Sequence, residues 1–402
     1  MTSAAVDPHG DPEIALNEPT WRDGKRYAWL LGMLVPAFPL AAWALVEATG
    51  LGIFWFFGPF VVFAVFPFLD IVVGTDAENP PDSVIAWLEE DRYYRWVTYL
   101  YIPLQYVSLV AACYLWTSGD LTVIDSIGLA LTTGMVAGIA INTAHELGHK
   151  RASLERWLSK IALAQTGYGH FFIEHNRGHH VRVATPDDPA SSRLGESFWE
   201  FLPRTVKGSV TSAWELEAKR LRRMGKRPWS IHNDILNAWA MTIGLFAALA
   251  IVFGANVLPY LLIQAVLGFS LLEVVNYLEH YGLLRGKRDD GRYEITRPEH
   301  SWNSNNVASN VLLYHLQRHS DHHANPLRRY QALRHEDGAP QLPTGYAGMI
   351  VLATVPPAWR RVMDRRLLDH YGDDVTRANI HPRTRQRVLA RYGSSGTAAG
   401  NA

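Results

Sequence analysis

The amino-acid sequence predicts an all-α integral membrane protein, with six transmembrane helices in three hairpins and a cytoplasmic, histidine-rich helical cap. Three observations lead to this fold class. Apolar residues gather in six long blocks, basic residues lie only between certain blocks, and 17 histidines cluster close to the block ends. The overall composition hides this segregation, because 38 basic and 38 acidic side chains balance and 48% of the residues are hydrophobic.

The six apolar stretches are long enough to cross a bilayer. Each approaches or exceeds the ~20 residues that a helix needs to span a ~30 Å hydrocarbon layer. A buried helix of a soluble domain would explain any one stretch, but a domain of this size could not enclose six. Short links around Gly50, Gly119 and Gly254 predict antiparallel pairs. The stretches occupy residues 27–48, 51–73, 96–117, 122–144, 235–253 and 257–279.

The distribution of Lys and Arg predicts the orientation. Neither residue occurs in 27–91, 96–149 or 228–284. With six spans, all 38 basic residues therefore fall on one side of the membrane. The positive-inside rule makes that side cytoplasmic, so both termini are expected in the cytoplasm and the protein in a bacterial cytoplasmic (inner) membrane.

The same reasoning divides the chain into segments. Net charge near zero disfavours a nucleic-acid partner, and a single cysteine, Cys113, excludes a disulfide framework or a Cys-x-x-Cys site. The Gly/Ser/Ala composition of the C-terminal tail indicates a flexible end or a tether. We expect a flexible polar arm (1–20), spans one to four (21–144), a cytoplasmic segment with two histidine clusters (145–234), spans five and six (235–279), a second cytoplasmic segment with the remaining histidines (280–391) and the tail (392–402).

Four histidine clusters carry the predicted chemistry. In the first, a four-residue step places two imidazoles on one helix face. The second repeats that step, the third has steps of three and four, and the fourth is a single histidine at the end of span six. By the predicted topology all four clusters can converge at one membrane face. Their histidines are His145 and His149; His175, His179 and His180; His319, His322 and His323; and His280.

Simpler readings exist for each cluster. His-Glu-x-x-His alone indicates a zinc protease with Glu146 as base, but such an enzyme needs only one or two further ligands. A metal transporter would need ionisable residues in mid-span. Nine imidazoles suit two metals with four or five nitrogen ligands each, and imidazole binds iron as well as zinc or copper. Iron is preferred, since two redox-active irons can reduce O₂ and zinc cannot.

Carboxylates are expected to orient the imidazoles through their second nitrogens. The candidates of this kind are Glu146, Glu279 and Asp187, with Glu174, Asp188 and Asp321 as further possibilities.

The motifs resemble one family in particular. The stretches 145–150 (HELGHK), 174–180 (EHNRGHH), 276–282 (NYLEHYG) and 316–323 (LQRHSDHH) look like those of the alkane 1-monooxygenase family, within the membrane desaturase–hydroxylase superfamily. The resemblance covers about residues 25–390 and implies that the nine histidines hold two iron ions. It also implies hydroxylation of the terminal methyl of medium-chain n-alkanes with O₂. The alternatives are a desaturase or hydroxylase of fatty acyl or alkyl-aromatic substrates and, from another class, the intramembrane zinc protease.

An alkane has no polar group, so burial of its methylenes, ~0.8 kcal/mol each, must supply the binding energy. Bulky residues of span two, above all Trp55 with Phe54, are tentative candidates for closing an apolar tunnel. The chain shows no redox-cofactor motif, and the resemblance implies rubredoxin with its reductase as electron donor, possibly fused C-terminally. An arginine-rich stretch at 360–391 would attract such an acidic protein.

Overall fold

The computed structural model describes residues 21–393. The predicted arm (1–20) and nearly all of the predicted tail (392–402) lie outside the described residues. Within 21–393 the fold is helical, and extended backbone pairs only at isolated bridges. Six helical segments are long and apolar enough to cross a membrane. The chain is therefore an all-α, multi-pass membrane protein, as predicted.

The six spans match the predicted stretches to within a few residues. The largest differences are at α5, which begins four residues earlier, and at α6, which continues past the apolar block to include His145. The spans are η1 (Ala28–Ala37) with α1 (Phe38–Thr49); η2 (Gly52–Phe56), α2 (Phe57–Phe60), η3 (Val61–Val65) and α3 (Phe66–Val73); α5 (Arg92–Thr117); α6 (Val123–Gly148); α11 (Asp234–Phe253); and η6 (Ala255–Val257) with α12 (Leu258–His280).

The first two spans are irregular helices. Both begin with a 3₁₀ segment, and η3 in the second is a π-helix. Pro36 and Pro39 lie at the change from η1 to α1, and Pro59 and Pro67 flank η3. Proline removes a backbone donor and clashes with the preceding turn, which explains why helix geometry changes at these positions. Inside a membrane protein, neighbouring helices can compensate for the lost hydrogen bonds.

Helix α6 is the centre of the bundle and packs most extensively against α12. Glycines make this approach possible: a Cβ on Gly138 would lie 2.7 Å from Leu271 Cδ2, and one on Gly134 would lie 2.6 Å from Leu267 Cβ. The spacing of four residues puts both glycines on one face, as in small-residue packing of membrane helices. The close contact brings the last turns of α6 and α12, which carry His145 and His280, to the same end of the bundle.

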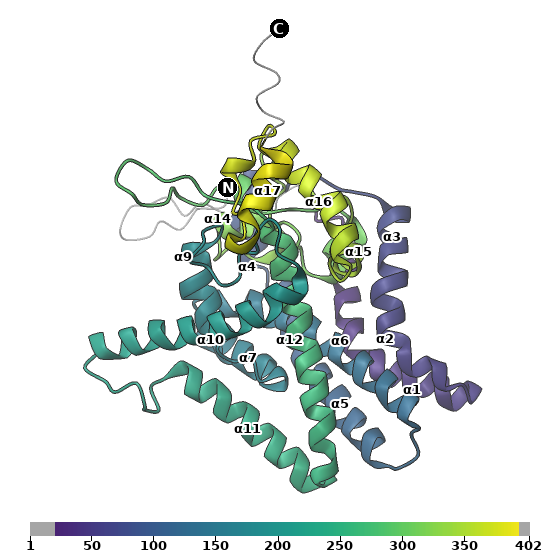
Figure 1. The fold of residues 1–402 in the computed structure, drawn as a ribbon. Helices are drawn as coiled ribbons and strands as arrows, with labels where there is room; N and C mark the ends of the chain where they lie inside the picture. Colours follow the sequence, from purple (N-terminus) through teal and green to yellow (C-terminus); the bar gives the residue numbers. More distant parts are fainter. Residues whose placement is uncertain (1–20, 394–402) are drawn as a thin grey trace, which may run out of the picture.

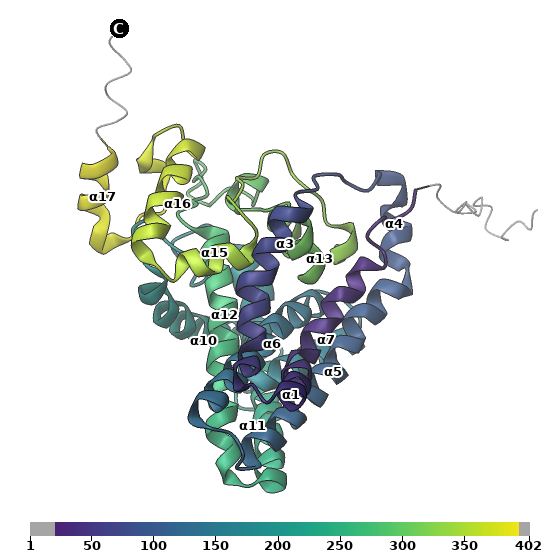
Figure 2. The ribbon, with the colours of Figure 1, turned by 90° about the vertical axis from the view of Figure 1, so that its right-hand side faces the viewer.

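Shorter elements connect and cover the spans. Figures 1 and 2 show the elements that follow α12 gathered at one end of the molecule, with α10 lying across the steep spans. The three-hairpin arrangement and the cytoplasmic side of this end stay predictions. The connecting elements are α4 (Asp82–Glu90), α7 (Ser153–Leu163), η4 (Ala164–Thr166), α8 (Phe171–Ile173), η5 (Glu174–His179), α9 (His180–Arg182) and α10 (Phe198–Arg223). After α12 come η7 (Pro298–His300), α13 (Val307–Leu312), α14 (His319–Ala324), η8 (Tyr330–Ala332), α15 (Tyr346–Ala353), α16 (Pro356–His370), η9 (Val375–Arg377), η10 (Pro382–Thr384) and α17 (Arg385–Tyr392).

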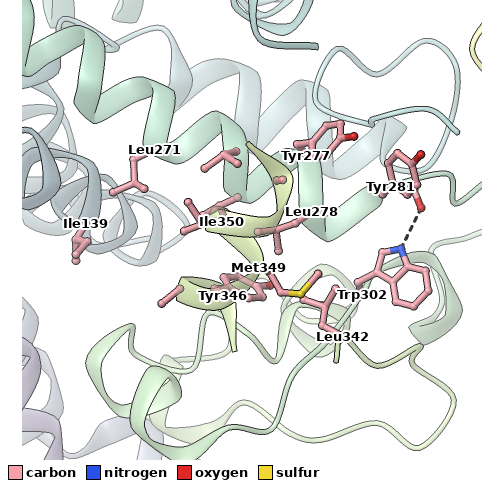
Figure 3. Packing of buried hydrophobic residues seen from close by; sticks show 14 of the residues in the cluster. Ile139, Leu271, Tyr277, Leu278, Tyr281, Trp302, Leu342, Tyr346, Met349 and Ile350 are labelled. Carbon is pink, nitrogen blue, oxygen red and sulfur yellow. Dashed lines mark hydrogen bonds between the residues drawn. The ribbon is translucent and has the colours of Figure 1, made fainter. Parts of the chain in front are cut away.

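The hydrophobic core is continuous between the spans and the C-terminal segment. Ile139 of α6, Leu271 of α12 and Ile350 of α15 belong to one cluster of buried residues. Figure 3 shows this cluster extending along α12 to Tyr281 and Trp302, where the Trp302 indole donates a hydrogen bond to the Tyr281 backbone carbonyl. The C-terminal segment is therefore anchored on α12 next to His280.

Candidate metal centre

The structure brings all nine predicted histidines together and divides them into two groups. His145, His149, His175, His180 and His322 form a five-histidine group, and His179, His280, His319 and His323 form a four-histidine group. In each group one nitrogen of every histidine lies within 4.8 Å of the corresponding nitrogen of every other member. Each group can therefore surround one metal ion.

The first cluster behaves as its spacing predicts. His145 lies in the last turn of α6 and His149 caps the helix. Their ring centroids are 5.0 Å apart, and both side chains contribute to the five-histidine group.

The second cluster is divided in a way that its four-residue step did not predict. His175 and His180 belong to the five-histidine group, whereas His179 belongs to the four-histidine group. The cause is local geometry, because residues 174–179 form a π-helix. The wider π turn brings residues five apart onto one face. The Nε2 atoms of His175 and His180 are accordingly only 3.0 Å apart.

The third cluster links the two groups. His319 and His323, one turn apart on α14, enter the four-histidine group, and His322 points to the five-histidine group. His280 completes the four-histidine group from the end of α12, where its Nε2 lies 3.2 Å from Nε2 of His319.

The nitrogen positions fit metal ligation. The Nε2 atoms of His145 and His322 are 2.8 Å apart, and those of His319 and His323 are 2.9 Å apart. Two nitrogens at about 2.1 Å from one metal and at right angles to each other would be separated by about 3 Å. The Nε2 atoms of His149 and His179 are buried without a hydrogen-bond partner among the described residues. These lone pairs are available to a metal ion.

Burial also keeps the ligands in the form that binds metal. Outside the spans, burial lowers the pKa of His149, His175, His319 and His322 well below the usual value for histidine, and neighbouring imidazoles lower it further. The rings are therefore neutral at physiological pH, and a neutral imidazole is the form that coordinates metals.

Two acids contact the four-histidine group. Asp188 Oδ2 lies 2.9 Å from His179 Nδ1, and although burial opposes its ionisation, His179 and Ser191 lower its pKa to about 2. Asp187, one of the predicted orienting acids, is exposed at the surface. The acid that contacts His179 is therefore Asp188, and the prediction of Asp187 was off by one residue. Glu279, also predicted, places Oε2 3.3 Å from His319 Nε2 and accepts a 2.8 Å hydrogen bond from Tyr346 on Oε1.

The other predicted acids bind basic side chains instead. Glu146 forms a buried ion pair with Lys150, at 3.0 Å. Glu174 pairs with Arg182 at 2.7 Å, and burial raises its pKa to about 7. Asp321, fully buried, holds Arg328. These acids brace the elements that carry the ligands.

An apolar pocket reaches both histidine groups. His145 and His175 of the five-histidine group, His319 of the four-histidine group, and Glu279 line its inner end. The remaining walls are mostly hydrophobic and come from six parts of the chain: Val62, Phe66, Gly138, Ile139, Asn142, Phe171, Leu271, Leu272, Val275, Asn276, Leu313, Leu316, Ala347 and Ile350. Most of these residues carry no sequence signal of their own, because they look like ordinary span residues.

Trp55 and Phe54, the predicted tunnel residues, do not line this pocket. Trp55 is buried in a separate apolar cluster, where it packs against Gly128 of α6. Val62, which does line the pocket, follows it by seven residues, or about two helical turns. Phe54 is half-buried.

Comparisons with known proteins agree with this site. The fatty acid desaturase family model matches residues 126–353, which include all nine histidines. The alkane 1-monooxygenase of Acinetobacter baylyi is 49% identical over 92% of each chain. That of Ectopseudomonas oleovorans is 46% identical over 94% of each chain, and alkane 1-monooxygenase 1 of Alcanivorax borkumensis is 46% identical over 93% of each.

Proposed function

Because this chain belongs to the family of alkane 1-monooxygenases, we propose that it hydroxylates the terminal methyl of medium-chain n-alkanes, using O₂, two iron ions and electrons from rubredoxin. One observation carries the proposal: histidines of both groups line the same apolar pocket. A substrate end in this pocket would lie beside both metals.

The histidine groups support iron over zinc. Zinc prefers four tetrahedral ligands, and a group of five imidazoles exceeds that number. Two bound irons would supply the reduction and cleavage of O₂. The chain's own residues hold the metals, exclude water from the pocket and place the substrate methyl. Asp188 orients His179 through its second ring nitrogen, whereas Glu279 lies beside Nε2 of His319, the nitrogen that faces the other histidines of the four-histidine group.

The pocket supports a linear hydrocarbon of moderate length. From Leu271 to Glu279 it follows eight residues of α12, about 12 Å. At ordinary C–C bond lengths this matches an extended chain of roughly ten carbons. A narrow apolar pocket exposes only the chain end to the metals, so positioning, not bond strength, selects the methyl group.

The orientation and the electron donor are parts of the same proposal. The basic residues between the spans support a cytoplasmic location of the metal centre in the inner membrane. A groove beside α16 and α17 is lined by four arginines and two acids, a net positive charge that supports docking of an acidic rubredoxin. The arginines are Arg360, Arg361, Arg365 and Arg391, and the acids are Asp364 and Asp373. Rubredoxin-driven turnover should then slow steeply as ionic strength rises. A flat response would remove this docking argument.

The central test combines metal and product analysis. The purified chain in lipid nanodiscs receives octane, ¹⁸O₂, rubredoxin, its reductase and a reduced nicotinamide, which supplies the two electrons that each alcohol and its accompanying water require. We expect two irons per chain and 1-octanol with one ¹⁸O atom. A solitary zinc, or 1-octene in place of the alcohol, would overturn the proposal.

A variant pair controls this test. His280→Ala should lose metal from the four-histidine group together with alcohol formation. His335→Ala, a histidine outside both groups, should keep both.

A further inference from the structure

A cluster of basic side chains lies where α10 turns into span five. Six basic residues and no acid occur between 219 and 232. Five of them, which we call the basic corner, form no ion pair within the described part of the chain. They are Lys219, Arg222, Arg223, Lys226 and Arg227.

The acids nearest to the basic corner are already engaged. Glu217 is buried and pairs with Arg177 at 2.8 Å and with Arg220 at 2.5 Å. Asp234 pairs with Lys160 at 2.6 Å. Glu215, exposed on α10, is the one other acid within four residues of the corner. The corner therefore carries a surplus of positive charge that the structure does not neutralise.

Large apolar side chains stand beside these charges. Trp229 is 76% exposed, Ile231 is 83% exposed, and Met224 is more than half exposed. In water such side chains would be costly, but a tryptophan next to basic residues is typical of the membrane interface. The Trp229 ring also packs against Trp214 of α10, with centroids 4.8 Å apart, which holds the turn against the helix.

Chain connectivity keeps this corner at the membrane. α11 begins at Asp234, so the corner precedes a span by only seven residues at its nearest charge. In Figure 1, the end of α10 points away from the bundle before the chain turns into α11, and four of the five residues of the basic corner are exposed. The corner is thus both uncovered by protein and close to the headgroup layer.

We propose that the basic corner, with Trp229 and Ile231, is a binding surface for anionic phospholipid headgroups. Clusters of basic residues next to a span attract acidic lipids. Trp229 and Ile231 enter the apolar edge of the interface, and the five cations contact the phosphates. An acidic protein would use the charges but would leave the exposed apolar residues unexplained. This surface is independent of the catalytic proposal.

The test places a probe inside the surface. Ile231→Cys is labelled with a thiol-reactive fluorophore; the native Cys113 is buried and is not labelled. Full-length protein is inserted into nanodiscs that contain brominated phosphatidylglycerol or, at the same bromine content, brominated phosphatidylcholine. We expect the acidic lipid to be enriched at the probe by at least about fivefold, the effect of one favourable charge contact.

Matched variants test whether the enrichment comes from the basic corner or from the overall positive charge of the protein. Replacing all five residues of the basic corner with Gln should bring the enrichment close to one. A control replaces five exposed arginines of the C-terminal segment with Gln and should keep it. The control residues are Arg361, Arg366, Arg383, Arg385 and Arg387.

Two outcomes would overturn the proposal. One is equal quenching by both lipids in the parent protein. The other is an equal loss of enrichment in the control variant. Raising the salt concentration tests the unaltered corner, since the enrichment must fall as the charges are screened. The salt measurement uses the parent protein, so the test stays decisive even if the variant with five Gln substitutions does not fold.

Discussion

Asp188 Oδ2 lies 2.9 Å from Nδ1 of His179 in the four-histidine group. The Ser191 hydroxyl donates a 2.6 Å hydrogen bond to the same oxygen, and Asp188 is fully buried. The carboxylate therefore accepts a hydrogen bond from the Nδ1–H of His179 and leaves Nε2 of His179, which has no partner among the described residues, free to bind metal. Such outer contacts fix the tautomer and orientation of a ligand.

Asp188→Asn should weaken metal binding in this group roughly 10- to 100-fold, because an amide cannot hold His179 in the same tautomer as firmly. Competitive chelation, followed by iron analysis, measures the change. Asp187→Asn is the control, since Asp187 is one residue away and exposed. Equal losses in the two variants would contradict the assignment to Asp188.

Trp302 holds the end of α12 from both sides of His280. Its backbone N–H donates to the Glu279 carbonyl at 2.8 Å, and its indole donates to the Tyr281 carbonyl at 3.0 Å (Figure 3). Trp302→Phe removes the second bond and leaves a buried carbonyl unpaired, at about 1–3 kcal/mol. We expect a changed Mössbauer signal from the four-histidine iron, with two irons still bound.

Trp359→Phe is the matched control for this prediction. Trp359 is equally buried and packs on Tyr277 and Tyr281, but its indole N–H has no partner among the described residues. The Trp359→Phe variant should lose stability without a change in its Mössbauer spectrum. Identical spectra for Trp302→Phe and the parent would show that the indole hydrogen bond of Trp302 does not position His280.

Leu271 lines the pocket at the level of Gly138, against which it packs, and is the pocket residue of α12 that lies furthest along the helix from Glu279. Leu271→Ala should lengthen the preferred alkane by roughly two carbons, each adding ~0.8 kcal/mol of burial. It should also cost about 2–5 kcal/mol of stability. Product profiles with C6 to C16 alkanes measure the shift, and Phe60→Ala, on a largely exposed residue of the same span as Trp55, is the control.

Trp55 does not line the pocket, but it packs against Gly128, which precedes Gly138 by ten residues on α6 and so lies further from His145. We therefore predict that Trp55 stops chains that pass the level of Leu271. Trp55→Ala should therefore admit the longest substrates, with the larger effect in the Leu271→Ala background. An unchanged product range in the double variant would refute a role for Trp55.

His170 predicts a pH dependence that does not involve the metal ligands. Burial lowers its pKa to about 4, and neither ring nitrogen has a partner among the described residues. Below about pH 6.5 the unfolded chain takes up a proton at this site that the folded chain does not. The free energy of unfolding should therefore fall by about 1.4 kcal/mol per pH unit, from pH 6.5 down to about 4.

His170→Phe should remove this contribution. Between pH 6.5 and 5 its stability relative to the parent should rise by about 2 kcal/mol, measured by denaturant unfolding in micelles. Metal loss at low pH affects both proteins equally and cancels in the difference. His232→Phe, at an exposed histidine, should show no such trend. A constant difference across this range would contradict the prediction.

The nine histidines that gather at the site could be identified from sequence, but their division into two groups could not. His145 and His149 obey ordinary helical spacing. His175 and His180 pair only because residues 174–179 adopt a π-helix, and no residue in that stretch requires it. The sequence also could not show whether Asp187 or Asp188 contacts His179. Adjacent acids are equivalent in sequence, and the loop's path decides which one is buried.

The sequence by itself determined the six membrane spans and the set of histidines that gather at the candidate metal centre, because both depend on local properties: the length of an apolar block and the chemistry of imidazole. The tertiary structure alone decided which histidines share a group, which acid contacts them and which span residues line the pocket. These features depend on how distant segments meet, above all on the close packing of α6 against α12 through Gly134 and Gly138, and residue type does not encode such contacts directly.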